Sequence, residues 1–182
     1  SRIRPRYNGQ VNDWWICDEG RFGFDSVDAQ NRLTAPLSAT DEAQKRVDWD
    51  AALETVVVRL RQAATEIGDV AVLVSPGLTN EELYMLKKVL AEQLPGTAVA
   101  FSKLNEHLPT EDDILRKADK NSNTTGAEFL GMSTENSEVK DHKSLLEAAV
   151  AGNLSALVVI SHDPVGLPAV YGRGWSKALD KV

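Results

Sequence analysis

The sequence predicts an α/β fold, in which helices flank a parallel sheet and a small irregular, β-rich module comes first. Three short apolar runs, residues 70–75, 97–101 and 156–160, have the composition of strands that are covered on both faces. Segments with helical spacing of apolar residues separate these runs. Because strand–helix–strand units of this length join parallel strands through right-handed crossovers, we expect all three runs in one Rossmann-like, three-layer sheet.

Three amphipathic helices are expected against this sheet. The first follows Asp48, a suitable N-cap, and ends near Gly68. The second begins with a capping box formed by Thr79 and Glu82, ahead of leucines at helical spacing. The third ends at Gly152 and leads into the last apolar run.

The other segments are less regular. A short helix is expected at residues 110–118, followed by a polar loop at residues 119–126. A last helix, residues 175–181, should lead to another strand, so we expect the sheet to be incomplete and the chain to be a piece of a longer protein. The predicted domains are residues 1–40, the irregular module, and residues 41–182, an incomplete α/β domain.

Residues 1–40 are rich in turn-forming residues. Arg2, Arg4 and Arg6 alternate along a segment that we expect to be a solvated edge strand, with Asn8-Gly9 as a hairpin turn. A binding patch for an acidic partner is the less favoured interpretation of these arginines.

The composition excludes several classes of function. The chain has 182 residues, of which 42% are hydrophobic and 26% charged, as in an ordinary soluble globular protein. A net charge of −7 argues against a nucleic-acid partner. No apolar run approaches the roughly 20 residues of a membrane span, and no signal-peptide pattern is present. The single cysteine excludes an intramolecular disulfide and suits a reducing compartment, so we expect a cytoplasmic protein.

The usual catalytic patterns are missing from the sequence. His107, His142 and His162 have no metal-ligand or nucleophile pattern beside them, and we interpret them as surface histidines. The turns at residues 75–79 and 161–166 follow buried strands, where open α/β sheets bind ligands, and the helix start at Thr79 could hold a phosphate. However, neither turn has a glycine-rich phosphate-binding motif, so a plain connection is the favoured interpretation.

Cys17 has two interpretations. A free cysteine is commonly buried as a small hydrophobic residue, here beside Trp14 or Trp15. Cysteines in turn-rich, glycine-containing segments also bind iron–sulfur clusters, whose sulfurs accept backbone N–H groups. A lone cysteine cannot bind a cluster, and residue spacing leaves both interpretations open.

The pattern N-x-x-W-x-C-D-x-G-R-F-G-F, followed by R-L-T-x-P-L, resembles a segment of the molybdopterin oxidoreductase superfamily. That segment supplies the last cysteine of a [4Fe–4S] cluster. Residues 114–132 and 147–165 are similar to the α/β region of the same superfamily. Within it, the resemblance is to the large iron–sulfur subunit of NADH:quinone oxidoreductase (complex I) and to the alpha subunit of NAD-linked formate dehydrogenase.

This resemblance implies that Cys17 is the fourth ligand of a [4Fe–4S] cluster, with the other three cysteines upstream of this chain. It implies electron transfer from NADH through iron–sulfur clusters, with no catalytic acid or base in the chain. Many members that contain molybdenum or tungsten have a lysine at the position of Glu19. A carboxylate there opposes electron delivery to an anionic pterin, so the resemblance favours a domain without molybdopterin.

The expected partners are the other subunits of a respiratory or NAD-linked redox complex, which could hold the protein on the inner face of the membrane. The chain alone is expected to be inactive and to lack the cluster. Three alternatives stay open: a subunit of the formate dehydrogenase type, a non-catalytic interaction module with a structural Cys17, and a domain that binds a nucleotide or pterin at the turns 75–79 and 161–166.

Overall fold

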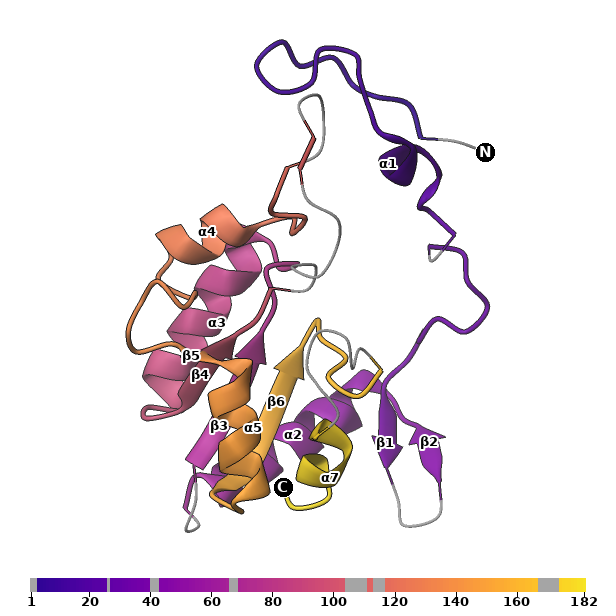
Figure 1. The fold of residues 1–182 in the computed structure, drawn as a ribbon. Helices are drawn as coiled ribbons and strands as arrows, with labels where there is room; N and C mark the ends of the chain where they lie inside the picture. The colour runs from indigo at the N-terminus through magenta and orange to yellow at the C-terminus, as the bar shows by residue number, and fades with distance from the viewer. Residues whose placement is uncertain are drawn as a thin grey trace. The chain divides into compact units, whose positions relative to one another are not determined.

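The computed structural model describes residues 3–25, 27–39, 43–65, 69–103, 111–112, 117–166 and 174–182. The chain divides into two compact units (Figure 1). One consists of Ser1–Val57 and Pro109–Ala118, and the other of Val58–Leu108 and Asp119–Val182.

The second unit contains a four-stranded parallel sheet. Its strand order is β5–β4–β3–β6. The strands are β3 (Asp69–Val74), β4 (Ala98–Phe101), β5 (Lys140–Asp141) and β6 (Leu154–Ile160). In the central register, Val72 of β3 lies opposite Val99 of β4 on one side and Val158 of β6 on the other. The three strands predicted from the apolar runs are therefore confirmed, and so is the parallel α/β class.

Helices cover both faces of this sheet. Alternate residues of β3 point to opposite faces, and each set packs against different helices. Val72 and Val74 pack in one apolar cluster with α3 (Asn80–Gln93) and α4 (Thr124–Phe129). Ala71 and Leu73 pack in another with α5 (His142–Val150) and α7 (Trp175–Leu179). Figure 1 shows α5 in orange and α7 in yellow on the same side of the sheet. The three predicted layers are present.

Burial differs between the strands. Every residue of β3 from Val70 to Val74 is buried, as expected for a central strand. In β6 only Leu154 is buried, and the other six residues are half-buried. The prediction that this strand is covered like β3 is therefore wrong. The reason is its position, because β3 is the only strand beside β6 in the described part of the chain.

The predicted helix caps are present. Glu82 N donates to Thr79 Oγ1 at 3.2 Å, and Thr79 N donates to Glu82 Oε2 at 2.8 Å, which is a complete capping box. Asp141 caps α5 by accepting from Ser144 N at 2.8 Å. Gly152 follows α5 with a φ of 74°, a backbone conformation that favours glycine at a helix end.

Helix α2 (Trp49–Ala63) forms as predicted, but its apolar stripe is not buried. Ala51 N donates to Asp48 Oδ1 at 2.8 Å, which confirms the N-cap. Trp49 and Leu53 are nevertheless 66% and 56% exposed, and Ala63 is the buried residue of the helix. Helical spacing predicts that an apolar face exists, whereas its burial depends on a neighbouring surface. The predicted end at Gly68 lies outside the described residues.

The first unit contains α1 (Asp18–Phe22) and a small antiparallel pair, β1 (Leu37–Ala39) and β2 (Gln44–Arg46). The predicted strand at the arginines is wrong for residues 3–6, which form no strand. Pro5 lacks an N–H group and cannot complete a strand ladder there. Arg2 lies outside the described residues.

The predicted two-residue turn at Asn8-Gly9 is longer in the structure. Asn8 and Asp13 form an antiparallel bridge that closes it. The carbonyl of Asn8 accepts from the N–H groups of Val11, Asn12 and Asp13, which curls the intervening residues into one loop.

The irregular segment contains two further differences. The predicted helix at residues 110–118 lies mostly outside the described residues, and residues 111, 112, 117 and 118 are not helical. The polar loop at residues 119–126 is shorter than predicted, since α4 begins at Thr124. Among the helices in the described ranges, none is both long and apolar enough to cross a lipid bilayer.

Candidate functional site

Cys17 directly precedes α1 in the first unit and is half-buried. Its carbonyl accepts from Arg21 N at 3.0 Å, so the cysteine is joined to the first turn of the short helix. This part of the turn-rich segment is helical in the structure, since Gly20, Arg21 and Phe22 belong to α1. The side chain of Glu19 lies outside the described part of the structure.

Gly20 lies close to Ile16, the residue that precedes this cysteine. A Cβ at position 20 would lie 3.1 Å from Ile16 Cγ1 and 3.9 Å from Cys17 Sγ. A contact of 3.1 Å requires a shift of Ile16, whereas 3.9 Å from the thiol is an ordinary van der Waals distance. The glycine of the C-D-x-G pattern therefore leaves room for the Ile16 side chain.

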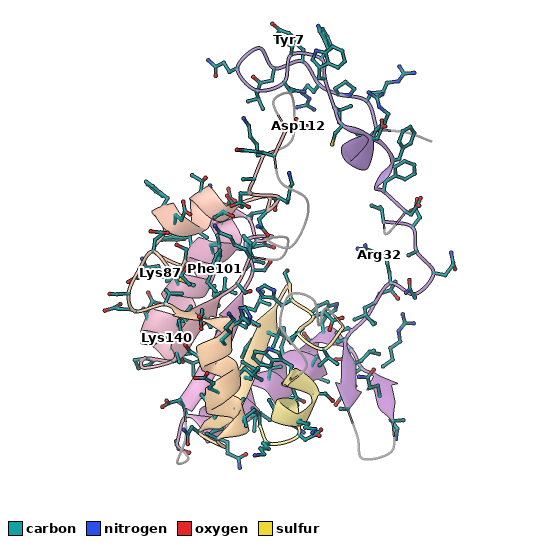
Figure 2. The ribbon with its side chains drawn as sticks, viewed as in Figure 1. Tyr7, Arg32, Lys87, Phe101, Asp112 and Lys140 are labelled. Atoms are coloured by element: carbon teal, nitrogen blue, oxygen red, sulfur yellow. The ribbon has the colours of Figure 1, made fainter. Side chains whose placement is uncertain are left out.

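The aromatic residues around Cys17 do not form a core. Trp14 and Trp15 are both 67% exposed, and the ring centroids of Trp14 and Tyr7 lie 5.0 Å apart. Figure 2 labels Tyr7 in the loop that precedes α1. No hydrophobic side chain described between residues 3 and 57 is buried. The interpretation of Cys17 as an apolar filler beside these tryptophans therefore has little support within the first unit.

In the second unit, polar residues gather where the parallel strands end. The chain leaves β3 toward β4 on one side and later returns to β6 on the other, so the strand order reverses between β3 and β6. Open α/β sheets bind ligands in the crevice outside such a reversal. Both turns identified in the sequence, residues 75–79 and 161–166, lie there because they directly follow β3 and β6.

Two histidines lie near the carboxyl ends of these strands. His142 is the first residue of α5, and its Nδ1 lies 3.1 Å from Ser102 Oγ at the end of β4. His162 follows β6, and burial lowers its pKa below the ordinary value of 6.5. A hydrogen bond with the Val74 backbone opposes this shift, while the nearby positive charge of His142 adds to it. Both histidines are half-buried, so the prediction of surface histidines is wrong for these two, and His107 lies outside the described residues.

Acidic residues in this unit are held in their ionised form. Burial raises the pKa of Asp119, but hydrogen bonds from Asn121 and the charge of Lys103 outweigh it and hold this pKa below its ordinary value. Lys103 Nζ lies 3.8 Å from Asp119 Oδ2. Hydrogen bonds from Ser144 lower the pKa of Asp141 in the same way.

The two turns do not fit a phosphate or a pterin pyrophosphate. The N–H of Gly77 donates to Ser75 Oγ at 2.9 Å, and that of Gly166 donates to Asp163 Oδ1 at 2.7 Å. The N–H of Thr79 is already bonded to the Glu82 carboxylate. An anion at these turns would compete with internal acceptors and lie beside carboxylates, which agrees with the plain connection that the sequence favoured over an anion site at Thr79.

The described residues offer few metal ligands in one place. Within the described ranges, no three side chains from His, Cys, Asp and Glu are grouped so that they could hold a metal ion. Cys17 is the single thiol of the chain and has the right chemistry for one corner of an iron–sulfur cluster. This chain therefore offers one of about four thiolates that such a cluster takes.

Comparison with known families gives one match to a family model. The model described as "Molybdopterin oxidoreductase" matches residues 32–145, more than half of the chain. The matched range includes β3, α3 and β4 and begins after Cys17.

The curated relatives include proteins named as formate dehydrogenases and as subunits of NADH oxidoreductases. "Putative formate dehydrogenase YrhE" of Bacillus subtilis (strain 168) is 35% identical over 63% of this chain. One subunit of the NADH-quinone oxidoreductase of Escherichia coli (strain K12) is 29% identical over 64% of the chain. The mitochondrial NADH-ubiquinone oxidoreductase 78 kDa subunit of Candida albicans is 32% identical over 49% of it. The chain spans 12% of the length of each of these relatives.

Proposed function

The chain belongs to the molybdopterin oxidoreductase family, and on that premise we propose that it is part of an oxidoreductase subunit that passes electrons from NADH through iron–sulfur clusters. Two relatives support this proposal, because their names describe subunits of NADH:quinone oxidoreductases. In this proposal the partners are the other subunits of such a complex, and the protein lies on the cytoplasmic face through them.

The residue that we propose for this function is Cys17, as one ligand of a [4Fe–4S] cluster. The supporting observation is the pattern of residues 12–24, in which this thiol directly precedes a short helix. The family match begins at residue 32, so the role of Cys17 depends on the resemblance of the preceding segment.

The cluster would supply one-electron chemistry, and the protein would supply ligands, burial and hydrogen bonds that set the reduction potential. Cys17 would hold one iron, and three thiolates from outside this chain would hold the others. We propose residues 1–40 as the end of the iron–sulfur module and residues 41–182 as part of the α/β domain, which acts as a scaffold and a docking surface.

A subunit of the formate dehydrogenase type is the alternative, supported by the Bacillus relative. Glu19 disfavours it, because the carboxylate stands where many molybdenum members have a lysine. The bonded N–H groups at the turns 75–79 and 161–166 also disfavour a pterin there.

The test uses a longer protein that includes the sequence upstream of Ser1. After reconstitution with iron and sulfide, we expect about four irons per chain and the visible absorption of a [4Fe–4S] cluster. Cys17→Ser should lose the cluster or destabilise it strongly. Asp25→Asn, an exposed change in the same unit, is the matched control and should keep it. Full, equally stable iron loading of Cys17→Ser would overturn the ligand assignment.

A further inference from the structure

The Asn8-Gly9 pair lies in an exposed loop of the first unit. Asn8, Gly9 and Gln10 are all exposed, and the antiparallel bridge between Asn8 and Asp13 closes the loop. Tyr7, which Figure 2 labels, directly precedes the pair. Water therefore reaches both the side-chain amide of Asn8 and the backbone of Gly9, and the function proposed above uses neither residue.

An asparagine that precedes glycine is chemically labile in water, because the next backbone nitrogen can attack the side-chain amide. Glycine has no Cβ, so nothing shields this nitrogen or restricts the backbone angles that bring it to the amide carbon. In the described ranges, the N–H of Gly9 has no hydrogen-bond acceptor. The attacking atom is therefore not held by any contact in that part of the chain.

The side-chain amide of Asn8 is bonded through its oxygen. Asn8 Oδ1 accepts from Gln10 N at 3.0 Å, which draws electron density from the amide carbon and favours attack there. The Nδ2 atom, which has to leave, donates to no acceptor among the residues that the structure describes. Three asparagines differ from Asn8, because their Nδ2 atoms donate hydrogen bonds and the next residue is not glycine: Asn12, Asn121 and Asn136.

We propose that Asn8 is the deamidation site of the folded chain. Gly9 N forms a bond to Asn8 Cγ while the bond from Cγ to Nδ2 breaks, and ammonia leaves with the proton of the Gly9 N–H. The product is a cyclic imide of residues 8 and 9. Water then opens the ring, so that its oxygen enters the new carboxylate and a proton returns to Gly9 N. Opening at Cγ gives aspartate, and opening at the main-chain carbonyl gives isoaspartate.

Both products change the loop that leads toward Cys17. Each adds one negative charge to a chain whose net charge is −7. In isoaspartate the main chain runs through Cγ and becomes longer. The Asn8 carbonyl, which accepts from three N–H groups of the loop, then belongs to a free carboxylate. The loop therefore adopts another path, which alters the contact between the rings of Tyr7 and Trp14 beside the bridge.

Incubation of the 182-residue chain at pH 8, followed by tryptic digestion and mass spectrometry, measures the conversion of each asparagine. The peptide of residues 7–21 contains both Asn8 and Asn12, so one spectrum compares them. We expect Asn8 to convert about tenfold faster or more than Asn12, Asn121 and Asn136, because only Asn8 is followed by a residue without a Cβ. Conversion should be slower at pH 6, since the attacking nitrogen has to lose its proton. A chain digested without incubation gives the background.

Two variants separate this reaction from general instability. The φ of Gly9 is not in the left-handed region, so alanine suits the backbone, and its closest contact, 2.8 Å to Tyr7 Oη, is relieved by rotation of that side chain. Gly9→Ala should slow the conversion of Asn8 about tenfold or more. Asn8→Gln should abolish labelling of the incubated chain by an isoaspartate-specific methyltransferase, whereas the control Asn121→Gln should leave it unchanged.

Circular dichroism checks that each variant keeps its helices. The proposal would be overturned by an Asn8 that stays unmodified at pH 8, or by another asparagine that converts first. Equal rates for Asn8 in the wild type and in Gly9→Ala would overturn it as well. This proposal does not depend on the role of Cys17, since its chemistry needs only water.

Discussion

Ser102 and His142 are forty residues apart in the chain, yet Ser102 Oγ lies 3.1 Å from His142 Nδ1. Ser102 is buried at the end of β4, and His142 is the first residue of α5. The hydrogen bond therefore joins the end of a strand to the start of the helix that leads to β6. This contact links β4 and α5 at the carboxyl end of the parallel sheet.

Replacement of Ser102 by alanine should destabilise the second unit by about 0.5–1.5 kcal/mol, the usual net value of one hydrogen bond. The loss should appear as a lower urea midpoint at pH 7.5. Ser176→Ala, an exposed serine on α7, is the control and should change the midpoint little. Equal midpoints for wild type and Ser102→Ala would mean that the contact contributes nothing.

The lowered pKa of His162 predicts a pH dependence of stability. Above pH 6.5, the imidazole is neutral in both the folded and the unfolded chain, so the shift has no effect on stability. Below pH 6.5, the unfolded chain binds the proton more readily than the folded one, and stability falls until the folded pKa is passed. The urea midpoint should therefore decrease between pH 7.5 and pH 5.5.

His162→Gln should reduce this decrease, because glutamine does not titrate. His142→Gln should reduce it by less, since the charge of His142 is the smallest of the causes that act on the His162 pKa. Parallel curves for wild type and His162→Gln would show that other groups cause the dependence.

Helix α3 allows a graded test of core packing. Leu83 is fully buried, so Leu83→Ala should cost about 2–5 kcal/mol. Leu86 is half-buried, so Leu86→Ala should reduce the free energy of unfolding by less. Lys88 is exposed, and Lys88→Ala should stay within about 0.5 kcal/mol. Lys87 is no neutral control, because its Nζ donates to the Leu130 carbonyl at 2.8 Å. Equal costs at positions 83 and 88 would contradict this packing.

Gly126 in α4 is required by close packing. A Cβ there would overlap Asn80 Oδ1 and Asn123 Oδ1, which lie in the hydrogen-bonded contact between α3 and α4. Alanine usually stabilises a helix by about 1 kcal/mol relative to glycine. Here Gly126→Ala should instead destabilise by about 1–3 kcal/mol, the usual cost of overpacking, measured by thermal or urea unfolding.

The matched test is the same substitution in a chain that also carries Asn80→Ala and Asn123→Ala. Removal of both amides should make Gly126→Ala much less harmful, because the overlapping atoms are gone. An equal cost in both backgrounds would place the strain elsewhere.

The sequence was sufficient to predict the parts of the fold that have strong local signals. Strand β3 is a continuous apolar run from Val70 to Val74, and α3 begins with a capping box. Both signals act within a few residues. Strands β2 and β5 could not be predicted in this way. Gln44–Arg46 and Lys140–Asp141 are polar and short, and they are strands only because another strand lies beside them.

The polar residues at the carboxyl end of the sheet illustrate the same limit of local sequence patterns. The turns after β3 and β6 were identified because each follows an apolar run, but local pattern does not reveal strand order. His142 and His162 influence each other only because β6 returns beside β3. Likewise, the N–H groups of the turns are already bonded, which residue types alone do not reveal.

The last prediction concerns the first unit and Cys17. Within the described residues 3–57 no hydrophobic side chain is buried, so little apolar burial opposes local opening in this segment. Brief trypsin digestion of the 182-residue chain should therefore cut at Arg6, Arg21 and Arg46 before it cuts within α3. Mass spectrometry of the early products should identify a protected piece that contains the parallel sheet.

The same reasoning predicts that the half-buried thiol of Cys17 reacts fully with a disulfide reagent at urea concentrations that leave the second unit folded. Circular dichroism of the helices reports whether the second unit is intact. In the longer protein, reconstitution of the cluster should protect both the thiol and the arginine sites, because metal binding is coupled to folding. Slow cleavage of the first unit in this chain alone, at a rate equal to that within α3, would show that its apolar residues are packed without any cluster. Protection of the arginine sites that does not require iron would lead to the same conclusion.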